Sequence, residues 1–106
     1  MAWVYLVAAG ILEIVWAYAM KQSHGFTRLV PTSIMLVTMI GSFGLLSISM
    51  RTLPLGVAYT IWTGIGAVGA FVVGVTILGE TATPTRILAA LLIVSGLVLM
   101  KLSTSA

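Results

Sequence analysis

The feature that most constrains the fold is a succession of four apolar stretches, each close to 20 residues long, within only 106 residues. A transmembrane helix needs about 20 predominantly apolar residues. We therefore predict helices at about 3–20, 29–50, 54–78 and 84–102. The predicted fold class is an all-α integral membrane protein with four transmembrane helices per chain, in which residues 1–106 form a single four-helix transmembrane domain.

Composition supports a membrane protein and excludes several kinds of chemistry. Hydrophobic residues make up 60% of the chain and charged residues 7%, whereas a soluble domain carries about 25% charged residues. With no cysteine and one histidine, one chain has no cysteine-based or histidine-cluster metal site, so we predict no metal, no cofactor and no enzymatic activity. The net charge of +3 comes from five scattered Lys/Arg residues, which form no patch for nucleic acid and are better explained as loop anchors at lipid headgroups.

The prolines mark where the predicted helices begin. Pro31, Pro54 and Pro84 each fall in the first turn of a proposed helix, where proline is tolerated because that N–H has no intrahelical partner. Thr52 and Thr83 precede two of these prolines and are plausible N-caps.

The basic residues give only a weak orientation signal. Four spans place both termini and the second loop on one side, which carries 2 Lys/Arg residues, and the other two loops on the opposite side, which carries 3. The side of the termini carries Arg51 and Lys101, and the opposite side carries Lys21, Arg28 and Arg86. A single topology and insertion in both orientations both remain open on this count.

Because four short helices enclose little beyond packed side chains, a transport path needs at least a dimer, and dual insertion would make that dimer antiparallel. The fourth stretch is predicted to be a dimer contact or a lipid-facing support.

Glu13 is the main candidate for a functional residue. It lies near the middle of the first apolar stretch, and no Lys, Arg or His lies mid-helix to neutralise it. A charged side chain at the bilayer centre costs about 2.5–3.5 kcal/mol on insertion scales, so an intramembrane carboxyl indicates function. The alternative is a protonated acid that makes one interhelical hydrogen bond. A carboxyl that binds a proton or a cation, but never both at once, meets the minimum requirement for proton–cation antiport.

Four other residues could form the surroundings of Glu13. Trp16 follows it by three residues on the same helical face, and its indole can donate to a carboxylate or stack on a flat cation. Tyr59 and Trp62 are spaced i, i+3 on the third stretch, and in lipid their polar atoms need partners. Ser42 is a weaker candidate, because other mid-helix serines are equally available for packing or hydrogen bonding.

The glycine run at residues 64–69, with Gly64, Gly66 and Gly69, matches the pattern G-x-G-x-x-G. We reject a dinucleotide site, because that motif needs a preceding strand and a ribose-binding acid about 20 residues further on. The run lies instead within a lipid-length apolar stretch. Close helix packing is therefore the favoured role, with a hinge in the third helix as the alternative.

Four motifs together resemble the small multidrug resistance family of bacterial transporters, and most closely its guanidinium-exporter branch. The resemblance covers the whole chain. Trp16 and the run that begins at Trp62 separate this branch from the promiscuous drug-exporting branch. The motifs are Gly10-Ile-Leu-Glu13-Ile-Val-Trp16, Lys21-x-x-x-Gly25-Phe-Thr-Arg28, Leu53-Pro54-Leu-Gly56-Val-Ala-Tyr59 and Trp62-Thr-Gly64-Ile-Gly66-Ala67.

This resemblance implies a multi-pass protein of the bacterial inner membrane that works as an antiparallel, dual-topology homodimer. It implies proton-coupled export of guanidinium by alternating access, with protons and substrate competing for the two Glu13 carboxylates. It also implies that Trp16 and Ser42 support Glu13 by hydrogen bonding and that Tyr59 and Trp62 line the site.

The expected substrate suits this chemistry, because guanidinium is a planar, permanently charged fork of N–H donors that matches a carboxylate. Two carboxylates can bind one monovalent cation or two protons, which favours two-for-one exchange. Gly44 stands where relatives often carry a bulkier residue, which bears on whether alkyl-substituted guanidinium ions are admitted.

Three other functions are weighed against this one. Within transport, the alternative is a promiscuous exporter of quaternary-ammonium or polyaromatic cations. A proton-translocating rotor subunit also carries a buried carboxyl, but an acid on the first of four helices with tryptophans nearby argues against it. A membrane assembly subunit without transport activity would have no evident use for Glu13.

Overall fold

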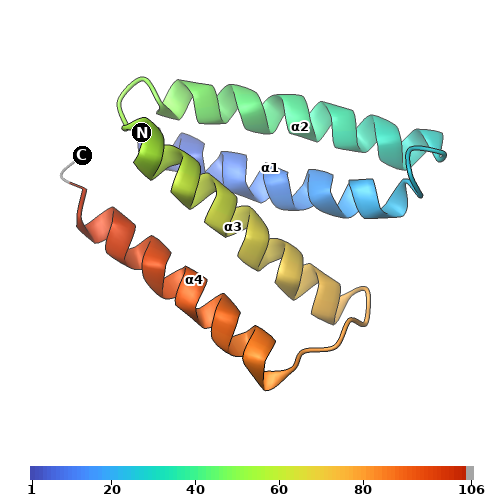
Figure 1. Cartoon of the computed structure of the whole chain (residues 1–106). Helices are drawn as coiled ribbons and strands as arrows, with labels where there is room; N and C mark the ends of the chain where they lie inside the picture. The colour runs from blue at the N-terminus through green and yellow to red at the C-terminus, as the bar shows by residue number, and fades with distance from the viewer. Residues whose placement is uncertain (105–106) are drawn as a thin grey trace.

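The computed structural model describes residues 1–104, and they form four helices joined by short loops (Figure 1). All four helices are long and apolar enough to cross a membrane, so the prediction of an all-helical chain with four membrane-spanning segments is confirmed. The helices are α1 (Ala2–Gln22), α2 (Leu29–Ser49), α3 (Leu55–Thr76) and α4 (Pro84–Leu102).

Helices α2 and α4 have a proline in their first turn as predicted, whereas the start of α3 differs from the sequence-based expectation. Pro31 lies in the first turn of α2 and Pro84 is the first residue of α4. Thr83 caps α4, because its Oγ1 accepts a hydrogen bond from the Arg86 N–H at 3.2 Å. Pro54, by contrast, is the N-cap of α3 and lies outside the helix, in an extended conformation.

Thr52 does not cap α3, contrary to the prediction. Its N–H donates to the Ser49 carbonyl at 3.3 Å, and the Leu53 N–H donates to the same carbonyl at 3.0 Å. These bonds hold Thr52 in a tight turn that follows α2. The residue before a proline is also biased away from helical geometry, so the helix cannot begin upstream of Pro54.

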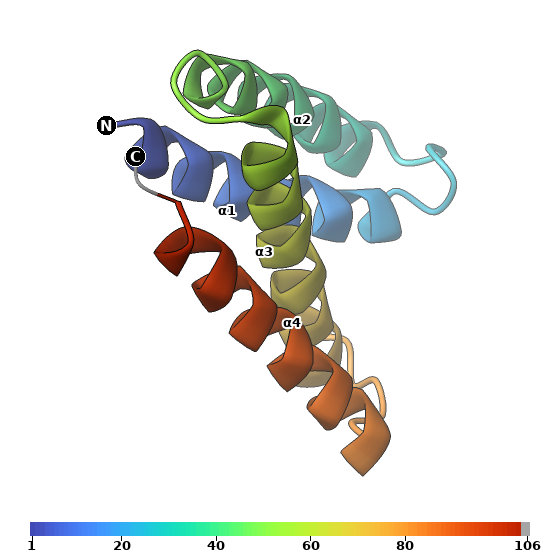
Figure 2. The ribbon, with the colours of Figure 1, turned by 60° about the vertical axis from the view of Figure 1, so that its left-hand side comes forward.

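The first three helices form the packed part of the molecule. α1 packs against both α2 and α3, and α4 packs against α3 alone. Figures 1 and 2 show α2 running alongside α1, α3 crossing α1, and α4 lying along the outer side of α3. No residue of α4 is buried. At the end of the molecule where α1 begins, the Lys101 Nζ of α4 lies 4.6 Å from the ring centroid of Trp3.

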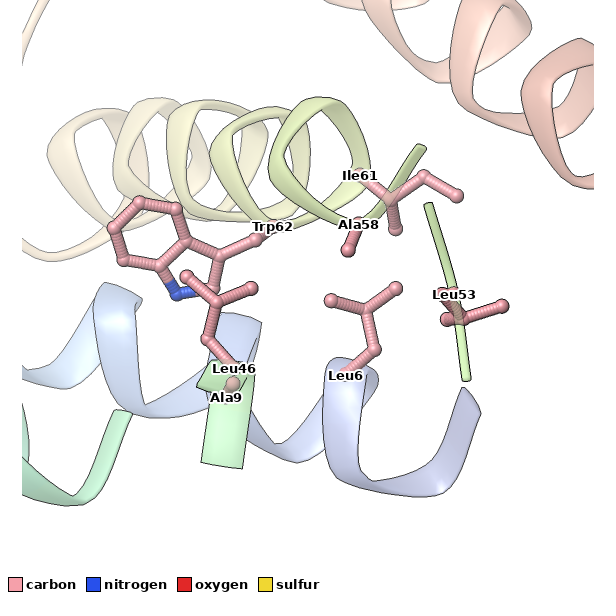
Figure 3. Close-up of a cluster of buried hydrophobic side chains, with 7 residues drawn as sticks. All are labelled: Leu6, Ala9, Leu46, Leu53, Ala58, Ile61 and Trp62. Atoms are coloured by element: carbon pink, nitrogen blue, oxygen red, sulfur yellow. The ribbon is translucent and has the colours of Figure 1, made fainter. Parts of the chain in front are cut away.

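The buried core lies where α1, α2 and α3 meet, toward the beginning of α1 (Figure 3). Close approach there depends on Gly10, since a Cβ atom at this position would lie 2.7 Å from the Ile65 Cγ2. Such close contact matters in lipid, where helices associate by packing and hydrogen bonds rather than by the hydrophobic effect. The core residues are Leu6, Ala9, Leu46, Leu53, Ala58, Ile61 and Trp62.

Candidate functional site

Glu13 lies on the face of α1 that meets α3, directly opposite Gly66. A Cβ atom at Gly66 would overlap the carboxyl group of Glu13 and would lie 2.8 Å from its Cγ. Gly66 is itself buried. The bare backbone of α3 therefore provides the space that the Glu13 carboxyl occupies, which gives Gly66 a more specific role than the general packing predicted from the glycine run.

Two polar atoms near the middle of α1 are buried without a partner. The Glu13 Oε1 and the Trp16 Nε1 form no hydrogen bond with any group in the described part of the chain. The hydrogen bond expected from Trp16 to Glu13 is thus absent from this structure. The Trp16 indole instead packs edge-on against Phe43 of α2, with ring centroids 6.4 Å apart and an interplanar angle of 74°. A buried donor and a buried acceptor, each costly to leave unsatisfied, consequently lie one helical turn apart.

Ser42 connects three helices rather than supporting Glu13 directly. Its Oγ donates to the Ala9 carbonyl of α1 at 2.6 Å and accepts from the Trp62 Nε1 of α3 at 2.9 Å. Since a serine hydroxyl has one proton to donate, the donation to Glu13 expected from the family resemblance is not made here. Ala9 precedes Glu13 by one helical turn, so Ser42 fixes the backbone just before the carboxyl.

The structure also distinguishes Ser42 from the serines that sequence reasoning left equivalent. Ser49 and Ser95 donate only to carbonyls of their own helices, Leu46 and Leu91 respectively. Ser42 is fully buried, and its hydroxyl reaches two other helices.

A row of four aromatic side chains crosses the site from α3 through α2 to α1. Tyr59 and Trp62 have ring centroids 5.5 Å apart, Trp62 and Phe43 5.8 Å, and Phe43 and Trp16 6.4 Å. Trp62 is buried, whereas the Tyr59 side chain is 53% exposed and faces outward beside Trp62.

Sequence reasoning did not single out Phe43, which connects the two tryptophans. The available signal was its position beside Ser42, on a helix that faces Trp16.

The three glycines of the run at residues 64–69 contact two different helices. A Cβ atom at Gly69 would overlap Ile14 of α1, and one at Gly64 would lie 2.5 Å from the Leu97 Cδ2 of α4. These close approaches account for glycine at each position. The α3 helix runs without interruption from Leu55 to Thr76, and the hinge role stays a prediction.

The arrangement is suited to binding a cation that donates hydrogen bonds. Glu13 offers a carboxyl oxygen as the acceptor, and the aromatic rings of the site, Trp16 among them, offer π faces. Residues 1–104 contain no group of three or more His, Cys, Asp or Glu side chains that could hold a metal ion.

The four apolar helices and the intramembrane carboxyl define a small multi-pass membrane protein with a polar site among its first three helices. The chain belongs to the Small Multidrug Resistance protein family, whose family model matches residues 1–93.

Relatives named "Guanidinium exporter" match nearly the whole chain. The protein from Citrobacter freundii is 55% identical over 104 residues, which cover 98% of this chain and 99% of that protein. The protein from Salmonella typhi is 53% identical over 103 residues (97% and 98%), and that from Escherichia coli (strain K12) is 52% identical over 104 residues (98% and 99%). The predicted family is confirmed, and the chain is a multi-pass protein of the bacterial inner membrane.

Proposed function

We propose that this protein exports guanidinium in exchange for protons and has no enzymatic activity. Family membership supports transport as the general class, and the name "Guanidinium exporter" carried by relatives at 52–55% identity supports guanidinium as the substrate. The Glu13 carboxyl is the group for which protons and guanidinium compete.

The observation that carries this proposal is the buried Glu13 Oε1, a hydrogen-bond acceptor without a partner in the described part of the chain. A carboxylate accepts the paired N–H donors of guanidinium, and the adjacent ring system can stack on its flat face. A proton on the carboxyl removes both the negative charge and part of the acceptor capacity. Binding of one ligand therefore excludes the other, as antiport requires.

The proposed working unit is an antiparallel homodimer in which each chain, residues 1–106, contributes one four-helix domain. In a single chain the Glu13 Oε1 is buried where α1 faces α3 and has no partner among the described residues. A second copy in the opposite orientation supplies a second Glu13, and alternating access follows if the two copies exchange conformations. Two carboxylates then hold two protons or one guanidinium ion.

The test is transport by purified protein in liposomes under a pH gradient, with guanidinium and tetraalkylammonium compared. We expect guanidinium to move against its gradient when protons move down theirs. The Glu13→Gln variant, which keeps the shape but cannot exchange a proton, should lose coupled exchange while its circular dichroism spectrum is unchanged. Glu13→Asp is the matched control, because it retains a carboxyl and should retain coupled exchange.

Two results would overturn the proposal. Uphill guanidinium transport by Glu13→Gln would remove Glu13 from the mechanism. Exchange of tetraalkylammonium without exchange of guanidinium would favour the alternative function, a quaternary-ammonium exporter.

A further inference from the structure

A groove of about 360 Å³ opens between α1 and α3 at the end of the molecule that carries the first and third loops. In Figure 1 the two helices diverge toward this end, beyond the point where they cross. At its inner end the groove is lined by Ile14 and Ala67, the chain neighbours of Glu13 and of the glycine that faces it. The groove therefore runs from residues that adjoin Glu13 and Gly66 in the chain to the loop end of the molecule.

The outer end of the groove carries a carboxyl group and two aromatic rings. Glu80, Tyr18 and Phe71 line it, together with Lys21. Tyr18 and Phe71 are half-buried, whereas Glu80 and Lys21 are exposed. A carboxyl group and two aromatic rings therefore line the same groove.

Glu80 is held at the C-terminal end of α3 by its own backbone. Its N–H donates to the Gly74 carbonyl at 2.9 Å. A Cβ atom at Gly74 would lie 2.7 Å from the Glu80 Oε1, so the carboxyl group packs against bare helix backbone.

The negative charge of Glu80 does not stabilise α3, because the C-terminus of a helix already carries a partial negative charge. Glu80 also forms no ion pair with any of residues 1–104, Lys21 included. The carboxylate and the end of α3 instead reinforce each other in attracting a cation to the groove.

We propose that the outer end of this groove is a second, weaker binding site for planar organic cations, which Glu80 captures between the Tyr18 and Phe71 rings before they reach Glu13. The proposal rests on the proposed function, since it names a site on the route of the same substrate. Lys21, on the opposite wall, repels the bound cation and keeps the site weak enough to release it.

The test is the initial rate of guanidinium exchange by Glu80→Gln in liposomes, measured over a range of guanidinium concentrations at low ionic strength. Loss of one exposed carboxylate–cation interaction should raise KM about three- to fivefold. The maximal rate should stay unchanged, because the exchange step at Glu13 is untouched. The change in KM should shrink at high salt, since exposed charges are screened.

Three further variants separate capture from a general structural effect. Lys21→Gln removes the repelling charge from the same groove and should lower KM. Gly74→Ala keeps both charges but displaces the Glu80 carboxyl group, and should raise KM as Glu80→Gln does. Arg86→Gln changes a charge near the third loop without lining the groove, and should change KM by less than about twofold.

Equal KM values for the wild type and Glu80→Gln at low salt would overturn the outer site, as would a rise in KM for Lys21→Gln. If Glu80→Gln does not fold, Gly74→Ala and Lys21→Gln decide the question. Failure of the wild type to exchange guanidinium would instead overturn the proposed function, so the two failures are distinguishable.

Discussion

Ser42→Ala should destabilise the protein far more than a serine-to-alanine change elsewhere in a membrane helix. Ser42 is fully buried, and its hydroxyl connects the Ala9 carbonyl to the Trp62 indole. The Ala9 carbonyl lies within α1 and keeps its helical partner, but the buried Trp62 Nε1 loses its only hydrogen-bond acceptor in the described part of the chain. Leaving a buried donor unsatisfied costs about 1–3 kcal/mol, and interhelical hydrogen bonds in membranes are worth up to about 1.7 kcal/mol. We therefore expect a loss of about 1–3 kcal/mol in the free energy of unfolding.

A double-mutant cycle tests where this cost arises. Trp62→Phe removes the indole N–H and keeps an aromatic ring, so Ser42→Ala should cost about 1 kcal/mol less in that background. Ser95→Ala is the matched control, because Ser95 is exposed and donates only within its own helix; it should cost less than about 0.5 kcal/mol. Reversible unfolding in mixed micelles, followed by circular dichroism, gives all the values. Additive costs for Ser42→Ala and Trp62→Phe, or equal costs for Ser42→Ala and Ser95→Ala, would refute this reasoning.

The same variant discriminates between two roles for Ser42 in binding. Because the hydroxyl proton goes to Ala9, Ser42→Ala should leave the pH at which guanidinium binding is half lost nearly unchanged. A serine that donated to Glu13, as the family resemblance implied, would instead move that midpoint when removed. Tryptophan fluorescence titrations at several pH values measure it, since Trp16 and Trp62 lie in the site.

Three further predictions concern competition, close packing and topology. Guanidinium affinity should fall as pH falls, because a protonated Glu13 cannot bind the cation; a flat affinity between about pH 6 and 9 would remove the competition mechanism. Gly66→Ala should fold but lose most exchange activity, as the new methyl group displaces the Glu13 carboxyl, whereas Gly64→Ala, which contacts Leu97 instead, should retain it. A C-terminal topology reporter should give signal on both sides of the membrane, and two added lysines at one end should bias it strongly; signal on one side only would contradict dual topology.

The helices were predictable because each depends on local features of the sequence. An apolar stretch of sufficient length must satisfy its backbone internally in lipid, which requires a helix. The start of α4 could be predicted from Thr83 and Pro84, because a capping threonine and a proline act within the first turn of the helix itself. Thr52 was misassigned as a cap because the hydrogen bonds that hold it in a turn come from α2, and the spacing to Pro54 does not reveal them.

The contacts of the site residues depend on how the helices cross. The spacing of residues in the sequence therefore could not predict these contacts. The sequence contains several mid-membrane serines, and only the packing of α2 between α1 and α3 brings Ser42 to both Ala9 and Trp62. Phe43 was missed for the same reason, since its contacts with Trp16 and Trp62 join three helices. Glu13, in contrast, could be singled out from the sequence alone, because a carboxyl in the middle of an apolar stretch without a basic residue to neutralise it is costly in lipid.

The proposed homodimer follows from what one chain leaves incomplete. Helix α4 packs along α3 alone, apart from the contact of Lys101 with Trp3 of α1, and buries none of its residues, although it has the length and composition to cross a membrane. On the other side of the chain, the Glu13 Oε1 and the Trp16 Nε1 are buried without partners in the described residues. A second copy in the opposite orientation would cover apolar surface of α4 and supply a second Glu13 carboxyl group. The Glu13 Oε1 would then be paired by a proton or by an N–H of the substrate, whereas the Trp16 N–H needs an acceptor, which neither ligand supplies. On this reasoning the cost of leaving the Glu13 oxygen unpaired is what drives ligand binding.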